Sequence, residues 1–395
     1  MGIRRRERLV TKPFALVMLS TLAYFTAVGS VVPILPRYVT GPLGSDDLMV
    51  GVVVGAFAVS AVLLRPFVGG VGDRRGRRIL IIGGGVLAGI SIAGYALGDS
   101  VPVLILMRVL TGIGEAAYYV GAASVINDLA PDERRGEALS YFSLALFGGL
   151  ALGPIAGEAL LHASGFTLVW MFAAASSVLS GVVGFAVPET RPDDIADHAG
   201  GPIVNRGALL PGTVLASSIW ALATFNAFIP LYALDLGLSG ASIFFATHSA
   251  VVMSVRLFGA RLPDVLGPKK AASSALVAIA AGMLIMGAWS ETAGLFVGTI
   301  FYSLGHSLAF PALMTMAISR SSPAERGSVV GTFTAFFDLS FGLGAAAAGG
   351  VAMLIGYRGA FVTAAGVAAA GFVLLQSYAR RSETRTRLQE VGEAA

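Results

Sequence analysis

Long apolar runs separated by short polar or charged segments dominate this chain of 395 residues. Twelve of the runs approach or exceed the length of about 20 residues that an α-helix needs to cross a bilayer. They lie near residues 14–38, 48–71, 79–98, 102–127, 138–162, 166–187, 210–233, 241–262, 271–289, 293–318, 329–355 and 359–379. The pattern predicts an all-α integral membrane protein with twelve transmembrane helices.

One polar segment divides the runs into two sets of six. Residues 188–206 are rich in Pro and Asp and carry no apolar run, which is typical of a linker. We therefore expect an N-terminal six-helix bundle over residues 1–187 and a cytoplasmic linker over 188–206. A C-terminal six-helix bundle with a short basic tail is expected over 207–395.

A charged loop between the second and third runs occurs twice. Residues 65–78 read RPFVGGVGDRRGRR, and residues 256–269 read RLFGARLPDVLGPK. Arg256 follows Arg65 by 191 residues, and Asp264 follows Asp73 by the same number. A constant offset near half the chain length indicates a duplicated unit. The two bundles are therefore predicted to be pseudo-symmetric.

The first copy of this loop resembles the signature loop between helices two and three of the major facilitator superfamily. The resemblance rests on Gly69, Asp73, Gly76 and the basic cluster, and Val71 departs from the Leu that is usual there. It implies the major facilitator fold and a secondary transporter that works by alternating access. Asp128, at the end of the fourth run, matches the family's partner for this loop. The resemblance thus implies a cytoplasmic gate of Asp73, Arg74, Gly76, Arg77, Asp128 and Asp264.

Composition and charge agree with a membrane protein and set its orientation. Mean hydropathy is +0.79 and 13% of residues are charged, against about 25% in soluble domains. There is no Cys, which excludes a disulfide framework and a cysteine metal site. Of 27 Lys and Arg residues, 22 fall on one side of the predicted spans. That side is predicted to be cytoplasmic and to hold both termini of a multi-pass inner-membrane protein.

Ionisable side chains fall in only some of the runs. The third, sixth, ninth and twelfth runs have none in their interiors, whereas others carry Arg65, Arg108, Glu115, Glu158, His248, Arg256, His306 and Asp338. Charge within lipid is costly unless it faces water or a partner, so these groups are expected to face the protein interior. In the superfamily every third helix is peripheral and the others line a central cavity, so the resemblance implies the same division.

The fourth run places a cation and an acid on one face. Arg108 and Glu115 are seven residues apart, which puts them about 10 Å apart along a helix, with Gly112 between them. Arg108, Gly112 and Gly114 resemble the fourth-helix motif of the superfamily, whose buried Arg is associated with proton coupling. A carboxylate beside a fixed cation stays charged, and it binds a proton when the cation moves away. Glu115 is the leading candidate for the proton carrier; a static pair with Arg108 is the alternative.

The fifth run contains Gly149, Gly153, Pro154 and Gly157. Glycines at every fourth residue form a groove for a neighbouring helix, and Pro154 removes a backbone hydrogen bond and bends the span. This segment resembles the fifth-helix motif of the drug:proton antiporter branch, which implies export. The family pattern ends in another glycine where this chain has Glu158. Glu158 is either a proton or cation-substrate site, or a group at the membrane interface.

Several further residues are candidates for the substrate cavity or for proton transfer. His306 lies 191 residues after Glu115, at the symmetric position of the second half, and is either part of a relay or a hydrogen-bonded structural residue. Asp338 is a candidate proton or substrate site because acids in membrane helices are usually functional. The remaining cavity candidates, with packing as the alternative for the tyrosines, are Asn226, Tyr118, Tyr119, Tyr24, Arg65, Arg256 and His248.

These features favour a carrier over an enzyme. The chain has no HExxH, GxSxG or P-loop motif, and a twofold repeat serves alternating access rather than catalysis. We expect proton-coupled export of a lipophilic or amphipathic compound by a monomer. It would contact substrate, protons and membrane lipids, with no nucleic acid, metal or cofactor other than the proton gradient. The alternatives are proton-coupled uptake of a small polar metabolite and translocation of a lipid or glycolipid.

Overall fold

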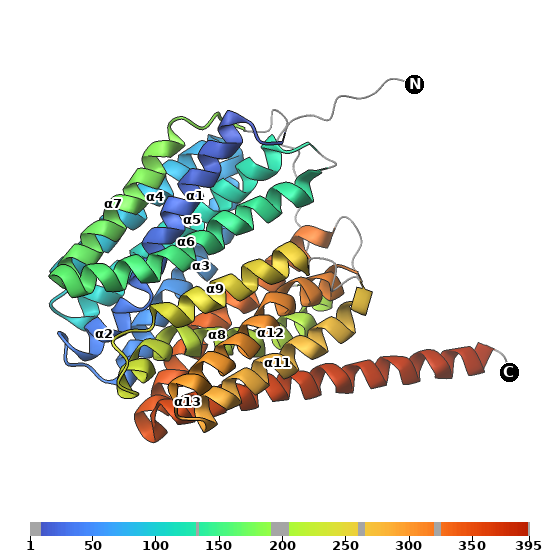
Figure 1. Cartoon of the computed structure of the whole chain (residues 1–395). Helices are drawn as coiled ribbons and strands as arrows, with labels where there is room; N and C mark the ends of the chain where they lie inside the picture. The colour runs from blue at the N-terminus through green and yellow to red at the C-terminus, as the bar shows by residue number, and fades with distance from the viewer. Residues whose placement is uncertain (1–8, 132–133, 191–204, 260–264, 320–324, 394–395) are drawn as a thin grey trace.

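The computed structural model describes residues 9–131, 134–190, 205–259, 265–319 and 325–393, and the described residues are helical with connecting turns (Figure 1). The helices are α1 (Lys12–Val31), α2 (Ile34–Thr40), α3 (Asp47–Arg75), α4 (Arg78–Ala93), α5 (Val101–Leu129), α6 (Arg135–Ser164), α7 (Phe166–Gly184), α8 (Arg206–Asp235), α9 (Ser242–Phe258), α11 (Pro268–Ala288), α12 (Thr292–Ile318) and α13 (Arg326–Glu393), with a 3₁₀ turn η1 (Gly94–Leu97).

The helices account for the predicted apolar runs. Ten described helical stretches are long and apolar enough to cross a membrane, and Ser242–Phe258 is a shorter apolar helix. The stretch Ser328–Tyr378 contains the last two predicted spans, because α13 is broken at Ile355 and Gly356, where Gly356 has φ 76°. The first predicted span contains α1 and α2, which are separated near Pro33. The prediction of an all-α membrane fold is confirmed.

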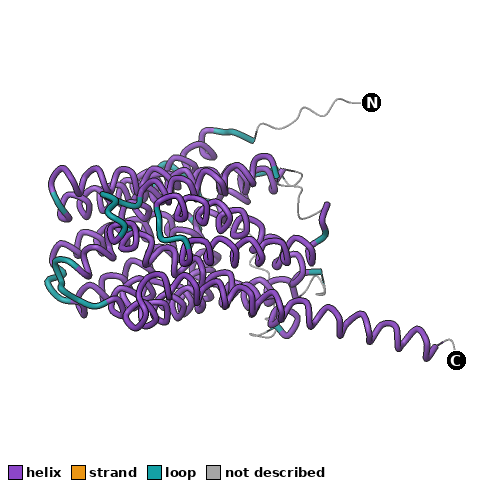
Figure 2. The backbone as a smooth tube through the Cα atoms, turned by 60° about the horizontal axis from the view of Figure 1, so that its bottom comes forward, coloured by secondary structure: helices purple, strands orange, loops and turns teal. Residues whose placement is uncertain are grey.

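Both ends of the helical chain lie at one end of the molecule. In Figures 1 and 2, α1 begins and α13 ends on the same side. We call this side the termini end and the other side the far end. The backbone of α13 stays helical through Glu393, so the segment predicted as a short basic tail continues the last helix.

The first and second halves of the chain form two neighbouring groups of helices, blue to green and yellow to red in Figure 1. The groups meet where α3 packs on α13 and where α6 packs on α9. Small residues allow the approach of α3 to α13: Gly55 faces Gly342, and a Cβ on Gly349 would lie 2.5 Å from the carbonyl oxygen of Asp47. These α3–α13 contacts gather toward the far end, where α3 begins.

The glycines of the predicted fifth-helix motif pack against α1. Gly149, Gly153 and Gly157 of α6 are buried, and a Cβ on Gly153 would lie 2.6 Å from the Cα of Gly29 in α1. Real side chains do not tolerate such a distance, so the two backbones touch only because these positions lack a side chain. Pro154 lies inside α6 and also packs on Gly29. The predicted helix-packing groove is therefore present.

We expect Gly153→Ala to lower the melting temperature of the purified protein, because the new methyl group must push α1 from α6 at a cost of about 1–3 kcal/mol. Gly148→Ala is the matched control in the same helix. Its Cβ would meet only the end of the Leu22 side chain at 3.3 Å, and alanine favours the helix. Equal melting temperatures for the two variants would contradict this account of the α1–α6 contact.

Candidate functional site

A cavity of about 220 Å³ lies among helices of both halves. Its walls are mostly apolar and aromatic, and its charged groups are Arg108 and Glu115, both from α5. The second half contributes Asn226 of α8 and two phenylalanines of α13 to the wall. The lining residues are Phe25, Val28, Val31, Val32, Leu35, Val54, Phe57, Ile92, Tyr95, Arg108, Thr111, Glu115, Leu150, Asn226, Phe337 and Phe341.

Arg108 is held at this cavity by neutral oxygen atoms. Its Nε donates to the carbonyl of Val53 at 3.2 Å, and its Nη2 donates to the carbonyl of Val54 at 3.3 Å. Its Nη1 donates to the hydroxyl of Tyr95 at 3.4 Å. The guanidinium also lies 4.8 Å from the ring centre of Phe57, a cation–π distance. Arg108 is thus a fixed cation between α3 and α5.

Glu115 lines the same cavity, as the spacing from Arg108 predicts. Arg108 directs its hydrogen bonds to Val53, Val54 and Tyr95 rather than to Glu115. The static Arg108–Glu115 pair is therefore not what holds the guanidinium in this state. Glu115 is half-buried, so it combines partial access to the cavity with a largely apolar setting.

The tyrosines proposed for the cavity pack elsewhere. The rings of Tyr24 and Tyr118 are stacked with centroids 4.0 Å apart, and both side chains are fully buried. The Tyr118 hydroxyl lies 2.6 Å from Ser20 Oγ. Tyr119 meets the ring of Phe142 edge-on. These three rings are not among the residues that line the central cavity in the described part of the chain, and they fill space between α1, α5 and α6 instead.

The two membrane histidines belong to an aromatic cluster of the second half. His248 of α9 and His306 of α12 have ring centroids 5.4 Å apart, and both stack against Tyr302. His248 Nδ1 lies 2.8 Å from Ser303 Oγ. His306 does not line the central cavity, although it is at the position in the second half that corresponds to Glu115. Its imidazole packs against Tyr302 and His248 instead.

Arg256 borders a second cavity, also of about 220 Å³, between α6, α9 and α12. It donates to Ser143 Oγ at 3.2 Å and lies 4.9 Å from the ring centre of Phe147. Both partners belong to α6 in the other half. Arg256 is near the end of α9, so this contact joins the halves nearer the termini end. The side chain of Arg65, its symmetric equivalent, lies outside the described residues.

The other two acids are buried. Asp338 of α13 is 5% exposed, and its neighbours Phe337 and Phe341 line the central cavity. Glu158 of α6 is 6% exposed and accepts hydrogen bonds from the backbone N–H groups of Ala241 at 2.5 Å and Ser242 at 3.0 Å. Neither acid is a surface group.

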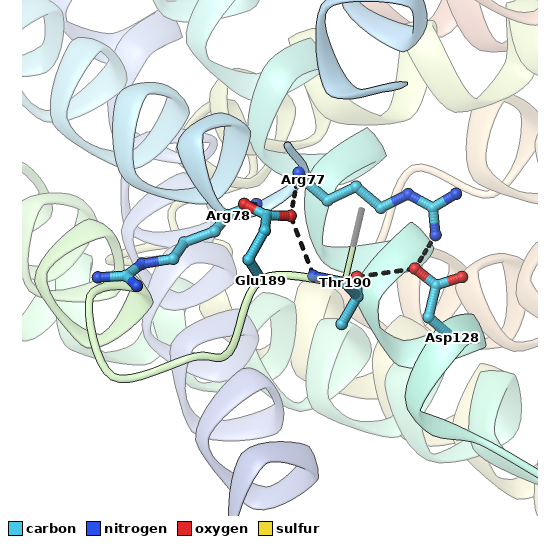
Figure 3. Close-up of polar contacts among 5 residues, drawn as sticks. All are labelled: Arg77, Arg78, Asp128, Glu189 and Thr190. Atoms are coloured by element: carbon cyan, nitrogen blue, oxygen red, sulfur yellow. Dashed lines mark hydrogen bonds and ion pairs between the residues drawn. The ribbon is translucent and has the colours of Figure 1, made fainter. Parts of the chain in front are cut away.

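The predicted gate loop joins the end of α3 to the start of α4, and Figure 3 shows the polar contacts of Arg77 and Arg78 there. Arg77 forms an ion pair with Asp128 of α5, as expected from the resemblance. Thr190 donates to Asp128 Oδ2 at 2.7 Å. Arg74 is exposed and Gly76 has φ 102°, a conformation that favours glycine. The side chain of Asp73 and the whole of Asp264 lie outside the described residues.

The family is decided by the match of the chain to a family model. A model described as Major Facilitator Superfamily matches residues 17–271 and 245–394. The chain belongs to the major facilitator superfamily. As a member, it is a multi-pass membrane transporter and not an enzyme.

Relatives and solved structures of the superfamily resemble the chain over nearly its whole length. The uncharacterized MFS-type transporter STM4428 of Salmonella typhimurium is 29% identical, covering 91% of this chain and 94% of the relative. The human organic anion transporter MFSD10 has a TM-score of 0.71 at 19% identity, covering 94% and 100% of the two chains. The nucleoside transporter NupG has a TM-score of 0.72 at 16% identity, covering 93% and 99%. These two structures show the fold.

Glu189 makes a contact with the predicted gate loop that the sequence pattern does not indicate. Glu189 accepts hydrogen bonds from the backbone N–H groups of Arg77 at 2.7 Å and Arg78 at 3.3 Å, where α4 begins (Figure 3). A carboxylate at a helix N-terminus meets unpaired N–H groups and the positive end of the helix dipole. In the sequence, Glu189 is an acid shortly after the sixth apolar run, on the same side as the basic loop. The prediction of a linker over residues 188–206 includes it and gives it no contact.

We expect Glu189→Ala to speed hydrogen exchange of the amides of residues 76–79, because the N–H groups of Arg77 and Arg78 lose their acceptor. The measurement is peptide-resolved exchange of the purified transporter. Glu137→Ala is the control, since Glu137 accepts from the Arg134 side chain. Unchanged exchange at residues 76–79 in Glu189→Ala would show that the contact does not hold the loop.

Proposed function

We propose that this transporter exports a lipophilic or amphipathic organic compound in exchange for protons. The observation that carries the proposal is the central cavity, in which one half-buried acid and one fixed cation face a mostly apolar wall. A site of this composition suits a cargo with a large apolar body and one polar or cationic group. A small polar metabolite would leave most of this wall without a favourable partner.

The aromatic rings supply most of the surface for the cargo. Phe25 and Phe57 come from the first half, and Phe337 and Phe341 come from the second. Asn226 adds hydrogen-bonding capacity from α8. A cargo that contacts both halves favours the arrangement in which they enclose it, which is how binding can be linked to alternating access.

Glu115 is the proposed proton carrier. When charged, it attracts the polar or cationic group of the cargo into a largely apolar cavity, where charges of opposite sign attract each other more strongly than in water. When it binds a proton, this attraction is lost and the cargo leaves. Arg108, bound to the carbonyls of Val53 and Val54, supplies a fixed positive charge at the same cavity. The proton gradient is then the energy source, with no cofactor.

The direction of transport rests on the resemblance of α6 to the drug:proton antiporter branch, together with the close α1–α6 packing at Gly149, Gly153 and Gly157. The proposal places the transporter in the inner membrane as a monomer, with the termini end cytoplasmic. This orientation follows from the Lys and Arg residues of that end.

Transport assays in liposomes test the proposal. The probes are permanently charged aromatic cations, which cannot accumulate by losing a proton, and neutral aromatic compounds. We expect at least one probe to accumulate in acid-inside liposomes that contain the transporter, and Glu115→Gln to abolish this accumulation while probe exchange at equal pH remains. This substitution removes the charge of the side chain and keeps its shape.

Glu291→Gln is the matched control, because Glu291 lies at the start of α12 outside the cavity, and it is expected to transport like the parent. Accumulation by Glu115→Gln at the parental level would show that another group carries the proton. Accumulation only in acid-outside liposomes would indicate symport and overturn the proposed direction.

A further inference from the structure

Glu158 joins the two halves of the transporter through the start of a helix. Its two carboxylate oxygens accept from the backbone N–H groups of Ala241 and Ser242, the cap and first residue of α9. Glu158 belongs to α6 in the first half, whereas α9 belongs to the second. The first N–H groups of a helix have no partner within the helix, and the helix dipole attracts an anion there. The two halves are therefore joined here by charge-assisted hydrogen bonds.

This bond lies where the structure is closed. Glu158 is near the far end of α6, and Ser242 begins α9 at the same end. The hydroxyl of Tyr357 in α13 donates to Asp47 of α3 at 3.3 Å, also across the halves. Gly349 lies against Asp47 in the same region. A transporter that alternates access must separate the halves at this end to open it, so these contacts must break.

We propose that Glu158 is the proton-binding site of the far-end gate, holding this end closed when charged and releasing it when protonated. A carboxylate can accept from both N–H groups at once, one on each oxygen. A protonated carboxyl carries a hydrogen on one oxygen and has no net charge, so it loses one of the two bonds and the attraction to the helix dipole. The contact is thus strong in only one protonation state.

No neighbouring charge replaces this effect. Within the described residues, all hydrogen bonds of Glu158 go to the start of α9, and no Lys, Arg or His forms an ion pair with it. Arg108 is bound to oxygens of α3 and η1, and His248 is bound to Ser303. Other charged or titratable groups lie near this end on the neighbouring elements, namely His162 on α6, Arg37 and Tyr38 on α2, Asp99 before α5, Asp235 on α8 and Glu291 at the start of α12.

This inference extends the proposed function, because a proton that arrives from the far side would open the gate before it reaches Glu115. Such an order is compatible with antiport, since the far end then opens when protons are abundant on that side. Glu158 acts at the gate, and Glu115 acts at the cargo.

A distance measurement tests the proposal without any cargo. The chain has no Cys, so spin labels can be placed at two introduced cysteines alone. Ala163 of α6 and Ser239 before α9 are both exposed at the far end. In lipid nanodiscs at neutral pH, we expect a main short distance between them. Lowering the pH or introducing Glu158→Gln should shift the distribution to longer distances, and Glu158→Gln should also remove the pH response.

Two further variants keep the test decisive. Gly240→Ala leaves the charge unchanged but places a methyl group against the Glu158 carboxylate, so it should shift the distances in the same direction. Asp46→Asn is the matched control, because Asp46 caps the start of its own helix α3 at the same end by accepting from Met49 N–H at 2.9 Å. It should leave the distances as in the parent. Parental distances and pH response in Glu158→Gln would overturn the proposal.

The outcome separates the two proposals. A shift in Glu158→Gln without proton-driven accumulation in liposomes would support the gate and reject proton-coupled export. Accumulation that depends on Glu115, with distances that do not respond to Glu158→Gln, would support export and reject the gate.

Discussion

Hydrocarbon offers no hydrogen-bond partners, and this constraint shapes the whole transporter. Backbone N–H and C=O groups in the membrane must form hydrogen bonds within the protein. An α-helix forms these bonds within a single segment, so this chain crosses the membrane as helices. Where a helix begins or ends inside the protein, its free groups need other partners. At the starts of α4 and α9 these partners are the carboxylates of Glu189 and Glu158.

Arg108, Glu158 and Glu189 illustrate this pairing of charge with backbone. Arg108 donates to the carbonyls of Val53 and Val54. The two glutamates accept from the first N–H groups of α9 and α4. A charged side chain that is bound to backbone groups does not depend on an ion pair with another side chain. Arg108 is therefore held by backbone carbonyls at the same cavity that Glu115 lines.

The two ends of the molecule differ in what joins the halves. At the far end, glycine contacts between α3 and α13 and the bonds of Glu158 bring backbones together. Nearer the termini end, Arg256 reaches Ser143 beside a cavity. Backbone contacts through glycine tolerate little displacement, whereas a long arginine side chain can follow a moving partner. The halves are therefore joined at the far end by a defined set of close backbone contacts.

The sequence alone predicted the apolar helices, the common face of Arg108 and Glu115, and the contact between Arg77 and Asp128. These features depend on hydrophobic run length, helical period and a motif of short range, which can be seen along one chain. Only the tertiary structure showed that Tyr24 and Tyr118 stack on each other, that His306 joins His248, and that Glu158 and Glu189 bind the starts of other helices. The contacts of Glu158 and Glu189 join residues 83 and 112 positions apart, and which helices become neighbours is decided by packing in three dimensions.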